Sequence, residues 1–269
     1  MRNIILALLC VLVGCGGKVS QRPSTTASAT ITSADVFNTG MIGQTWTFHN
    51  GYGDTTTISV EAAPAIASGF GGNNVVFHYR KDNARAYWNP GTPDAELWFV
   101  LHQQADTSWT STASLIKFPE SCVFCTNPPN WTSLTASSRP IVGKPIPYAI
   151  IPASATRGTT STIDTMYELH MAFNSPEPDF SDITLTQPPV AQVPWRNSFF
   201  TAYVSVPAYT GPALVSEQWE GPCFPVMQPG CAHEQWFFAP GLGLVEVVPI
   251  NLGAGDNADP QLTMYRDSL

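Results

Sequence analysis

Hydrophobic and polar residues alternate along most of the chain, and a period of two is typical of β-strands that bury one face. The first hairpin joins residues 44–50, which place Trp46 and Phe48 on one face, to the mostly β-branched residues 55–60. Turn-forming residues at 50–54 lie between these two segments. The same pattern predicts strands at residues 74–80, 84–89, 95–103, 107–118, 160–173, 199–206, 213–220, 234–239, 244–248 and 261–265.

No segment shows a helical period flanked by capping residues, and residues 64–68 are the best candidate for a short helix. Parallel strands need crossover helices. The pattern therefore predicts an all-β, antiparallel fold of roughly a dozen strands, either a sandwich or a curved open sheet (half-barrel). Residues 119–160 are rich in Pro, Ser and Thr and form either a long excursion or the seam between two halves. A single domain is preferred because no charge-rich linker separates the halves.

Composition narrows the class of partner. Of the 269 residues, 43% are hydrophobic, which is too many for a disordered chain. The 20 Gly and 24 Pro residues supply the turns that a strand-rich fold needs. Asp and Glu number 20 against 12 Lys and Arg, and the formal net charge is −8. Because binding to nucleic acid needs a basic surface, no nucleic-acid partner is expected.

The N-terminus has the outline of a secretory signal peptide. Arg2 is its one charge, and the apolar residues 4–13 end at the small residue Gly14. A helix of this length rises about 15 Å, half of a hydrocarbon core of about 30 Å. A cleaved signal peptide is therefore expected rather than a permanent membrane span.

The four residues Leu12-Val13-Gly14-Cys15 resemble the lipobox of bacterial lipoproteins. In that family the cysteine sulfur is diacylated, the chain is cut before the cysteine, and the new amine is acylated. The resemblance implies lipidation of Cys15 and a stable membrane anchor, since two or more acyl chains suffice. Ordinary signal cleavage beside a chance cysteine is the alternative. Gly16 replaces the Asp that retains enterobacterial lipoproteins in the inner membrane, so the resemblance favours the outer membrane or the cell surface.

Three segments are therefore expected. Residues 1–14 form the lipoprotein signal peptide, residues 15–33 the lipidated cysteine with a flexible Ser/Thr-rich tether, and residues 34–269 a single β-rich domain. An acidic body is not attracted to anionic headgroups. The partner at the membrane is thus the lipid anchor, and the tether gives the body its reach.

Two segments of the body share aromatic and glycine residues: residues 43–48 read Gly-Gln-Thr-Trp-Thr-Phe, and residues 236–247 read Trp-Phe-Phe-Ala-Pro-Gly-Leu-Gly-Leu-Val-Glu-Val. Together they resemble an arrangement in uncharacterised β-rich envelope lipoproteins. In those proteins an early Gly-x-x-Trp strand and a late Trp-aromatic strand with two glycines bracket the domain. That group carries no assigned chemistry, so the resemblance implies a fold and a location only.

The body has four cysteines besides Cys15, and an even number in an exported protein predicts disulfides. Three pairings are open. Cys223–Cys231 is favoured because Glu-Gln-Trp triplets at 217–219 and 234–236 flank it, as the two arms of a hairpin would. The remaining two then pair locally as Cys122–Cys125.

The spacing of Cys122 and Cys125 is also that of a redox or zinc half-site. A redox site needs a helix after the first cysteine, and Asn127-Pro128-Pro129 prevents one. The other two cysteines are too far apart for a second zinc pair. We therefore expect structural disulfides and no metal.

Motifs for catalysis are weak. The five histidines lack zinc-binding spacing. His233-Glu234 is the most interesting pair, although a structural role is favoured. Residues 114–117 match Ser-x-x-Lys but lack its partner motifs, and residues 256–259 lack the register of a calcium loop. No catalytic residue and no cofactor are expected.

Three tryptophans are candidate binding residues because they neighbour Pro and Asn in loop-like stretches: Trp88, Trp131 and Trp195. An exposed tryptophan can stack on a sugar ring or anchor a protein partner, whereas a buried one folds over the edge of the core. The sequence thus predicts a lipid-anchored envelope protein that acts as a binding or structural module for a carbohydrate or protein. The alternatives are a secreted hydrolase on a β-sandwich, with a cleft at His233 or a carboxylate pair, and a carrier of an apolar ligand in a half-open barrel.

Overall fold

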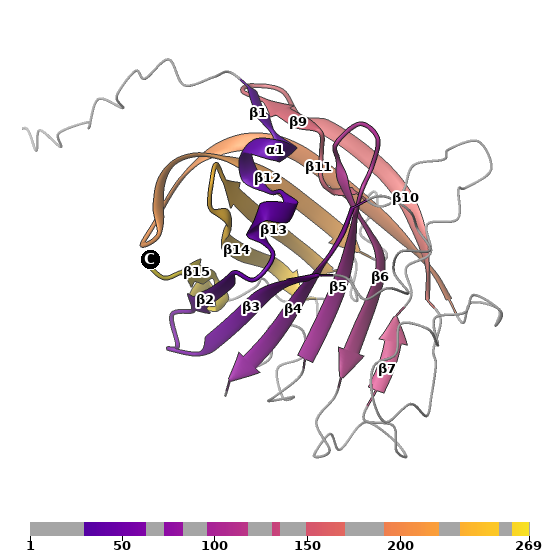
Figure 1. Cartoon of the computed structure of the whole chain (residues 1–269), viewed down its shortest axis with the longest axis horizontal. Helices are drawn as coiled ribbons and strands as arrows, with labels where there is room; N and C mark the ends of the chain where they lie inside the picture. Colours follow the sequence, from indigo (N-terminus) through magenta and orange to yellow (C-terminus); the bar gives the residue numbers. More distant parts are fainter. Residues whose placement is uncertain are drawn as a thin grey trace, which may run out of the picture.

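The protein is built from one large curved β-sheet (Figure 1). The structure, a computed structural model, describes residues 30–62, 73–82, 96–117, 131–134, 149–169, 191–220, 232–252 and 260–268. The strands are β1 (Thr30–Thr32), β2 (Thr45–His49), β3 (Thr55–Ala62), β4 (Asn74–Asp82), β5 (Glu96–Gln103), β6 (Trp109–Lys117), β7 (Trp131–Leu134), β8 (Ala149–Ile151), β9 (Ser154–Thr156), β10 (Ser161–Leu169), β11 (Ala191–Val206), β12 (Tyr209–Glu220), β13 (Ala232–Ala239), β14 (Gly243–Leu252) and β15 (Met264–Arg266). Helical turns are α1 (Ser33–Val36), η1 (Thr39–Met41) and η4 (Pro260–Leu262).

The order of strands in the main sheet is β10-β11-β12-β13-β14-β15-β2-β3-β4-β5-β6-β7, and β8 also pairs with β6. Every pairing is antiparallel. In the described part of the chain, β10 and β7 do not pair to close the sheet. The predicted all-β antiparallel class is confirmed, in the form of a curved open sheet.

Most predicted strands lie where the alternation placed them, including the first hairpin β2–β3. The strand predicted at 199–206 is longer than expected and begins at Ala191. The short strands β1, β7, β8 and β9 were not predicted, because three or four residues carry too little periodicity. The predicted strand at 84–89 and the predicted helix at 64–68 lie outside the described residues.

The expected tether reaches too far along the chain. Its last residues form β1, which pairs with β9, and the start of α1. Thr32 caps α1, since its hydroxyl accepts from the Asp35 amide and the Asp35 carboxylate accepts from the Thr32 amide. This capping box is a recognised signal for a helix start. Residues 30–33 therefore belong to described secondary structure rather than to the tether, and residues 1–29 lie outside the described part.

The first and last strands of the main sheet along the chain, β2 and β15, meet in the middle of the strand order. Strand β15 pairs with β14 on one side and with β2 on the other. The Arg266 guanidinium lies 5.1 Å from the Trp46 ring centre and donates to the Leu242 carbonyl. The Trp46 ring also packs against Gly243, which has a φ of +81°. Residues 43–48 and 236–247, which stand out in the sequence, are therefore in direct contact.

The sheet folds back on itself around an aromatic core. Tyr79 of β4 and Phe99 of β5 meet Trp236 of β13, with ring centres 6.2 and 5.9 Å apart. Since β13 is far from β4 and β5 in the strand order, these contacts join two layers of one sheet. Trp46 and Phe77 extend the same core.

The segment that contains α1 fills one end of the space between the layers (Figure 1). Phe37 is fully buried and makes edge-to-face contacts with Phe77 and Trp109, at 5.0 and 4.8 Å. The Gly241 amide, in the turn between β13 and β14, donates to the Asp35 carbonyl. The opposite end of the layers, toward Ala232, carries the polar groups described below.

No helix among the described residues is long and apolar enough to cross a bilayer.

Gly243→Ala should destabilise the fold strongly. An added Cβ would lie 2.7 Å from the Trp46 ring, and the positive φ disfavours any side chain. We expect a loss of about 3 kcal/mol in the free energy of unfolding, measured by chemical denaturation. Gly53→Ala is the matched control, because Gly53 has a φ of +79° and open space around its Cβ position. It should cost only about 1 kcal/mol, and equal losses for the two variants would contradict the proposed packing of Trp46.

Candidate functional site

A row of three polar side chains crosses the inner face of the sheet. Asn197 of β11 lies opposite Gln218 of β12, which lies opposite Glu234 of β13. Asn197 and Gln218 are each 1% exposed and Glu234 is 9% exposed. We call these three residues the inner polar row. They face the core because they are in phase with Trp236 and Leu214, which belong to it.

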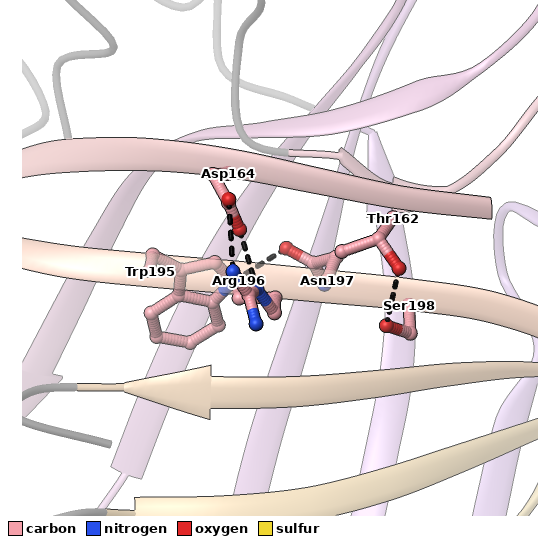
Figure 2. A network of polar contacts seen from close by, with 6 residues as sticks. All are labelled: Thr162, Asp164, Trp195, Arg196, Asn197 and Ser198. Atoms are coloured by element: carbon pink, nitrogen blue, oxygen red, sulfur yellow. Dashed lines mark hydrogen bonds and ion pairs between the residues drawn. The ribbon is translucent and has the colours of Figure 1, made fainter. Parts of the chain in front are cut away.

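An indole N–H donates to each end of the inner polar row. Trp195 Nε1 donates to Asn197 Oδ1, two residues along β11 (Figure 2). Trp236 Nε1 donates to Glu234 Oε1 at 2.7 Å. Asn197 Nδ2 donates to Ser216 Oγ at the longer distance of 3.5 Å. These bonds fix the orientation of the Asn197 and Glu234 side chains.

Tyr79 adds a hydroxyl from the opposite layer. Its Oη atom is buried and has no hydrogen-bond partner among the described residues. Burial, and next the negative charge of Glu234, raise the pKa of Tyr79 well above its ordinary value. The hydroxyl therefore stays protonated and remains a hydrogen-bond donor at all physiological pH values.

Packing does not account for this arrangement. The buried Tyr79 hydroxyl, without a partner among the described residues, costs about 1–3 kcal/mol of stability, and a core that only joined two layers would hold apolar side chains here. The places where a fold departs from such rules are concentrated at functional sites. The inner polar row, with Tyr79, is therefore the candidate functional site.

The outer face of the same strands also carries polar side chains. Glu217 Oε1 accepts hydrogen bonds from His233 Nε2 at 2.8 Å and from Gln235 Nε2 at 2.9 Å. Trp219 stacks on His233, with ring centres 4.6 Å apart. We call the whole set the outer polar strip: Thr162, Asp164, Arg196, Ser198, Glu217, Trp219, His233 and Gln235.

His233 is paired but not accessible. Its Nδ1 atom is buried and finds no hydrogen-bond partner in the described part of the chain. A general base must reach the proton that it removes. The burial of Nδ1 therefore keeps this atom out of reach of a substrate. No group of three or more metal-ligating side chains occurs among the described residues.

The three candidate tryptophans have different outcomes. Trp195 lies within β11 and is 9% exposed, so the expected loop position is wrong. Pro194 and Asn197 are residue types typical of loops, and their presence led to a loop prediction where the chain forms a strand. Trp131 is the first residue of β7, and Trp88 lies outside the described residues.

The cysteine predictions cannot be placed on the structure. All five residues lie outside the described part: Cys15, Cys122, Cys125, Cys223 and Cys231. The hairpin expected around the 223–231 pair is confirmed, since Glu217 lies opposite Gln235 and Trp219 opposite His233.

Sequence reasoning missed Tyr79, Asn197 and Gln218 as site residues, and it singled out Glu234 only in the pair His233-Glu234, for which a structural role was favoured. A signal for Gln218 was present, because this residue is in phase with the buried Leu214 along β12. Polar residues at buried positions of a strand are what the alternation should have singled out. Tyr79 gave no such signal, because its ring belongs in a core and only its hydroxyl is unusual.

Comparisons with models of protein families, with curated proteins and with solved structures found no match to this chain. The candidate site therefore rests on its own geometry.

Tyr79→Phe should leave the fold as stable as before or make it more stable. The variant removes a buried hydroxyl that has no partner in the described structure and keeps the ring contacts with Phe99 and Trp236. We expect a gain of up to about 1 kcal/mol in the free energy of unfolding. Tyr265→Phe, at a 37% exposed position, is the control and should change stability by less than about 0.5 kcal/mol. A loss of 1 kcal/mol or more for Tyr79→Phe would show that the hydroxyl is bonded after all.

Proposed function

We propose that this protein is a lipid-anchored binding module of the bacterial cell envelope, and that the inner polar row with Tyr79 contacts its ligand. The observation that carries the proposal is the buried Tyr79 hydroxyl, which lies opposite a row of buried polar side chains and has no hydrogen-bond partner among the described residues, at a cost in stability. Binding explains why it is kept, because a ligand that bonds to it would recover that cost on complex formation.

The chemistry of the row limits the ligand. Asn197 and Gln218 are amides, which both donate and accept hydrogen bonds, and the Tyr79 hydroxyl donates. Glu234 supplies a carboxylate, which repels anions inside a medium of low dielectric constant. The rings of Trp195, Trp236 and Phe99 surround these groups. We infer a small amphipathic ligand that is uncharged or cationic, with hydroxyl or amide groups beside an apolar part.

The same reasoning weighs against a carrier of purely apolar molecules. Such a carrier would line its interior with apolar side chains alone, as ligand pockets for hydrocarbons do. The inner polar row instead favours the binding of a ligand that forms hydrogen bonds. Anchoring at Cys15 would hold the body at the outer membrane or the cell surface, where it meets envelope components.

The ligand proposal is tested by thermal unfolding of the full chain carrying Cys15→Ser, which needs no detergent. The probes are a monoacylglycerol, an alkylammonium ion and a fatty acid of the same chain length. A ligand at 100 times its Kd stabilises the folded state by about 2.7 kcal/mol, or several degrees in Tm. We expect the uncharged or the cationic probe to raise Tm and the fatty acid to leave it unchanged.

The matched variants separate binding from stability. Gln218→Leu should fold but lose the response to the probes, and Leu214→Met, at an apolar position on the same face, should keep it. The binding proposal fails if no probe raises Tm, or if Gln218→Leu responds as the unchanged protein does.

The anchor is tested by mass spectrometry and fractionation of the native chain. We expect an N-terminal peptide that begins at Cys15 and carries three acyl groups, and a protein that sediments with membranes. Cys15→Ser should move the protein to the soluble fraction. An unmodified cysteine in the native protein would contradict the anchor and leave the ligand proposal standing.

A further inference from the structure

The outer polar strip forms a surface separate from the inner polar row. Successive residues of a strand point to opposite faces, so Arg196 and Ser198 lie on the opposite face from Asn197 (Figure 2). Strand pairing sets Asp164 opposite Arg196, Arg196 opposite Trp219, and Trp219 opposite His233. The strip therefore crosses four neighbouring strands in one line.

Contacts between strands hold the side chains of the strip in place. Arg196 donates to both carboxylate oxygens of Asp164, at 2.5 and 3.0 Å. Ser198 and Thr162 share a hydrogen bond of 2.9 Å between their hydroxyls. Together with the bonds to Glu217 and the stacking of Trp219 on His233, these contacts mean that little side-chain freedom is left to lose. Such preorganisation lowers the entropic cost of binding.

Access to the strip is graded along its length. The Asp164 and Arg196 side chains are 50% and 35% exposed, whereas Glu217 is 16% exposed and Ser198 and His233 are buried. Trp219 and Gln235 are partly exposed. A ligand that lies along the strip would thus meet charged groups at β10 and β11, and a ring and an amide at β12 and β13.

The charges on the strip exclude several partners. Asp164 and Arg196 neutralise each other, and Glu217 leaves a small negative surplus. Phosphate-bearing and sulfated partners need a positive surface, which the strip lacks. The guanidinium of Arg196, the carboxylate of Glu217 and the amide of Gln235 can each form two hydrogen bonds to neighbouring hydroxyls. The indole of Trp219 lies beside them. This combination suits a sugar ring, which carries many hydroxyls and no charge.

We propose that the outer polar strip binds an uncharged oligosaccharide. The sugar hydroxyls bond to Gln235, Glu217 and Arg196, and the apolar face of one sugar ring packs on Trp219. This site is independent of the inner polar row, since the two lie on opposite faces of β11, β12 and β13.

Binding is measured by calorimetry with the full Cys15→Ser chain and two neutral probes, cellohexaose and chitohexaose. We expect at least one probe to bind, and dextran sulfate not to bind. Trp219→Ala should weaken the binding at least tenfold. Because Trp219 stacks on His233 and its loss can disturb folding, Gln235→Leu serves as a second variant and should weaken binding at least threefold.

Tyr203→Ala provides the matched control, because Tyr203 is an exposed aromatic residue of β11 that does not belong to the strip. It should bind as the unchanged protein does. The proposal is overturned if neither neutral probe binds, if dextran sulfate binds more tightly than both, or if Trp219→Ala and Gln235→Leu fold and keep full affinity. Loss of binding in Tyr79→Phe would also overturn it, by moving the sugar to the inner face.

Discussion

The continuity of the sheet depends on the pairing of one short strand. β15 has three residues, yet it is the link between β14 and β2 and thus between the two halves of the sheet. So short a strand supplies few ladder hydrogen bonds. The side chains of β15 supply the remaining stabilisation of the junction. Met264 is buried in the main core, and Arg266 contacts both the Trp46 ring and the Leu242 carbonyl. His49 and Asp267, 2.8 Å apart, close the outer edge of the same junction.

Arg266 shows how this junction tolerates a buried charge. Burial lowers the pKa of its guanidinium from the ordinary value, but an arginine stays charged in proteins. The charge is offset by the face of an indole and by a carbonyl oxygen, which are the partners that a desolvated cation needs. The contact of Trp46 with Gly243 explains why a glycine stands at this turn. Residues 43–48 and 236–247 thus build one junction.

Sequence reasoning predicted the class of fold well and the site poorly, for one physical reason. Alternation reports which face of a strand is buried, and this was enough to locate β2, β3, β4 and their antiparallel pairing. It does not report what lies across the layer from a buried residue. The meeting of Tyr79 with Glu234 and Trp236 depends on how far the sheet curves, which no local pattern contains. Trp195 illustrates the same limit, since Pro194 suggested a loop where tertiary pairing with β10 maintains a strand.

A second candidate role for the inner polar row is to fix the register of the strands, but other features of the fold already fix it. Buried polar groups sometimes fix the register of paired elements rather than bind a ligand. Here the register of β11 with β12 is already set by the hairpin that joins Val206 to Tyr209, and a slip by one residue would turn Val215 and Leu214 to the wrong faces. The turn between β13 and β14 is fixed in turn by Gly243 against Trp46. Since the register is specified without the row, specificity of folding does not account for the buried Tyr79 hydroxyl, whereas the proposed contact with a ligand does.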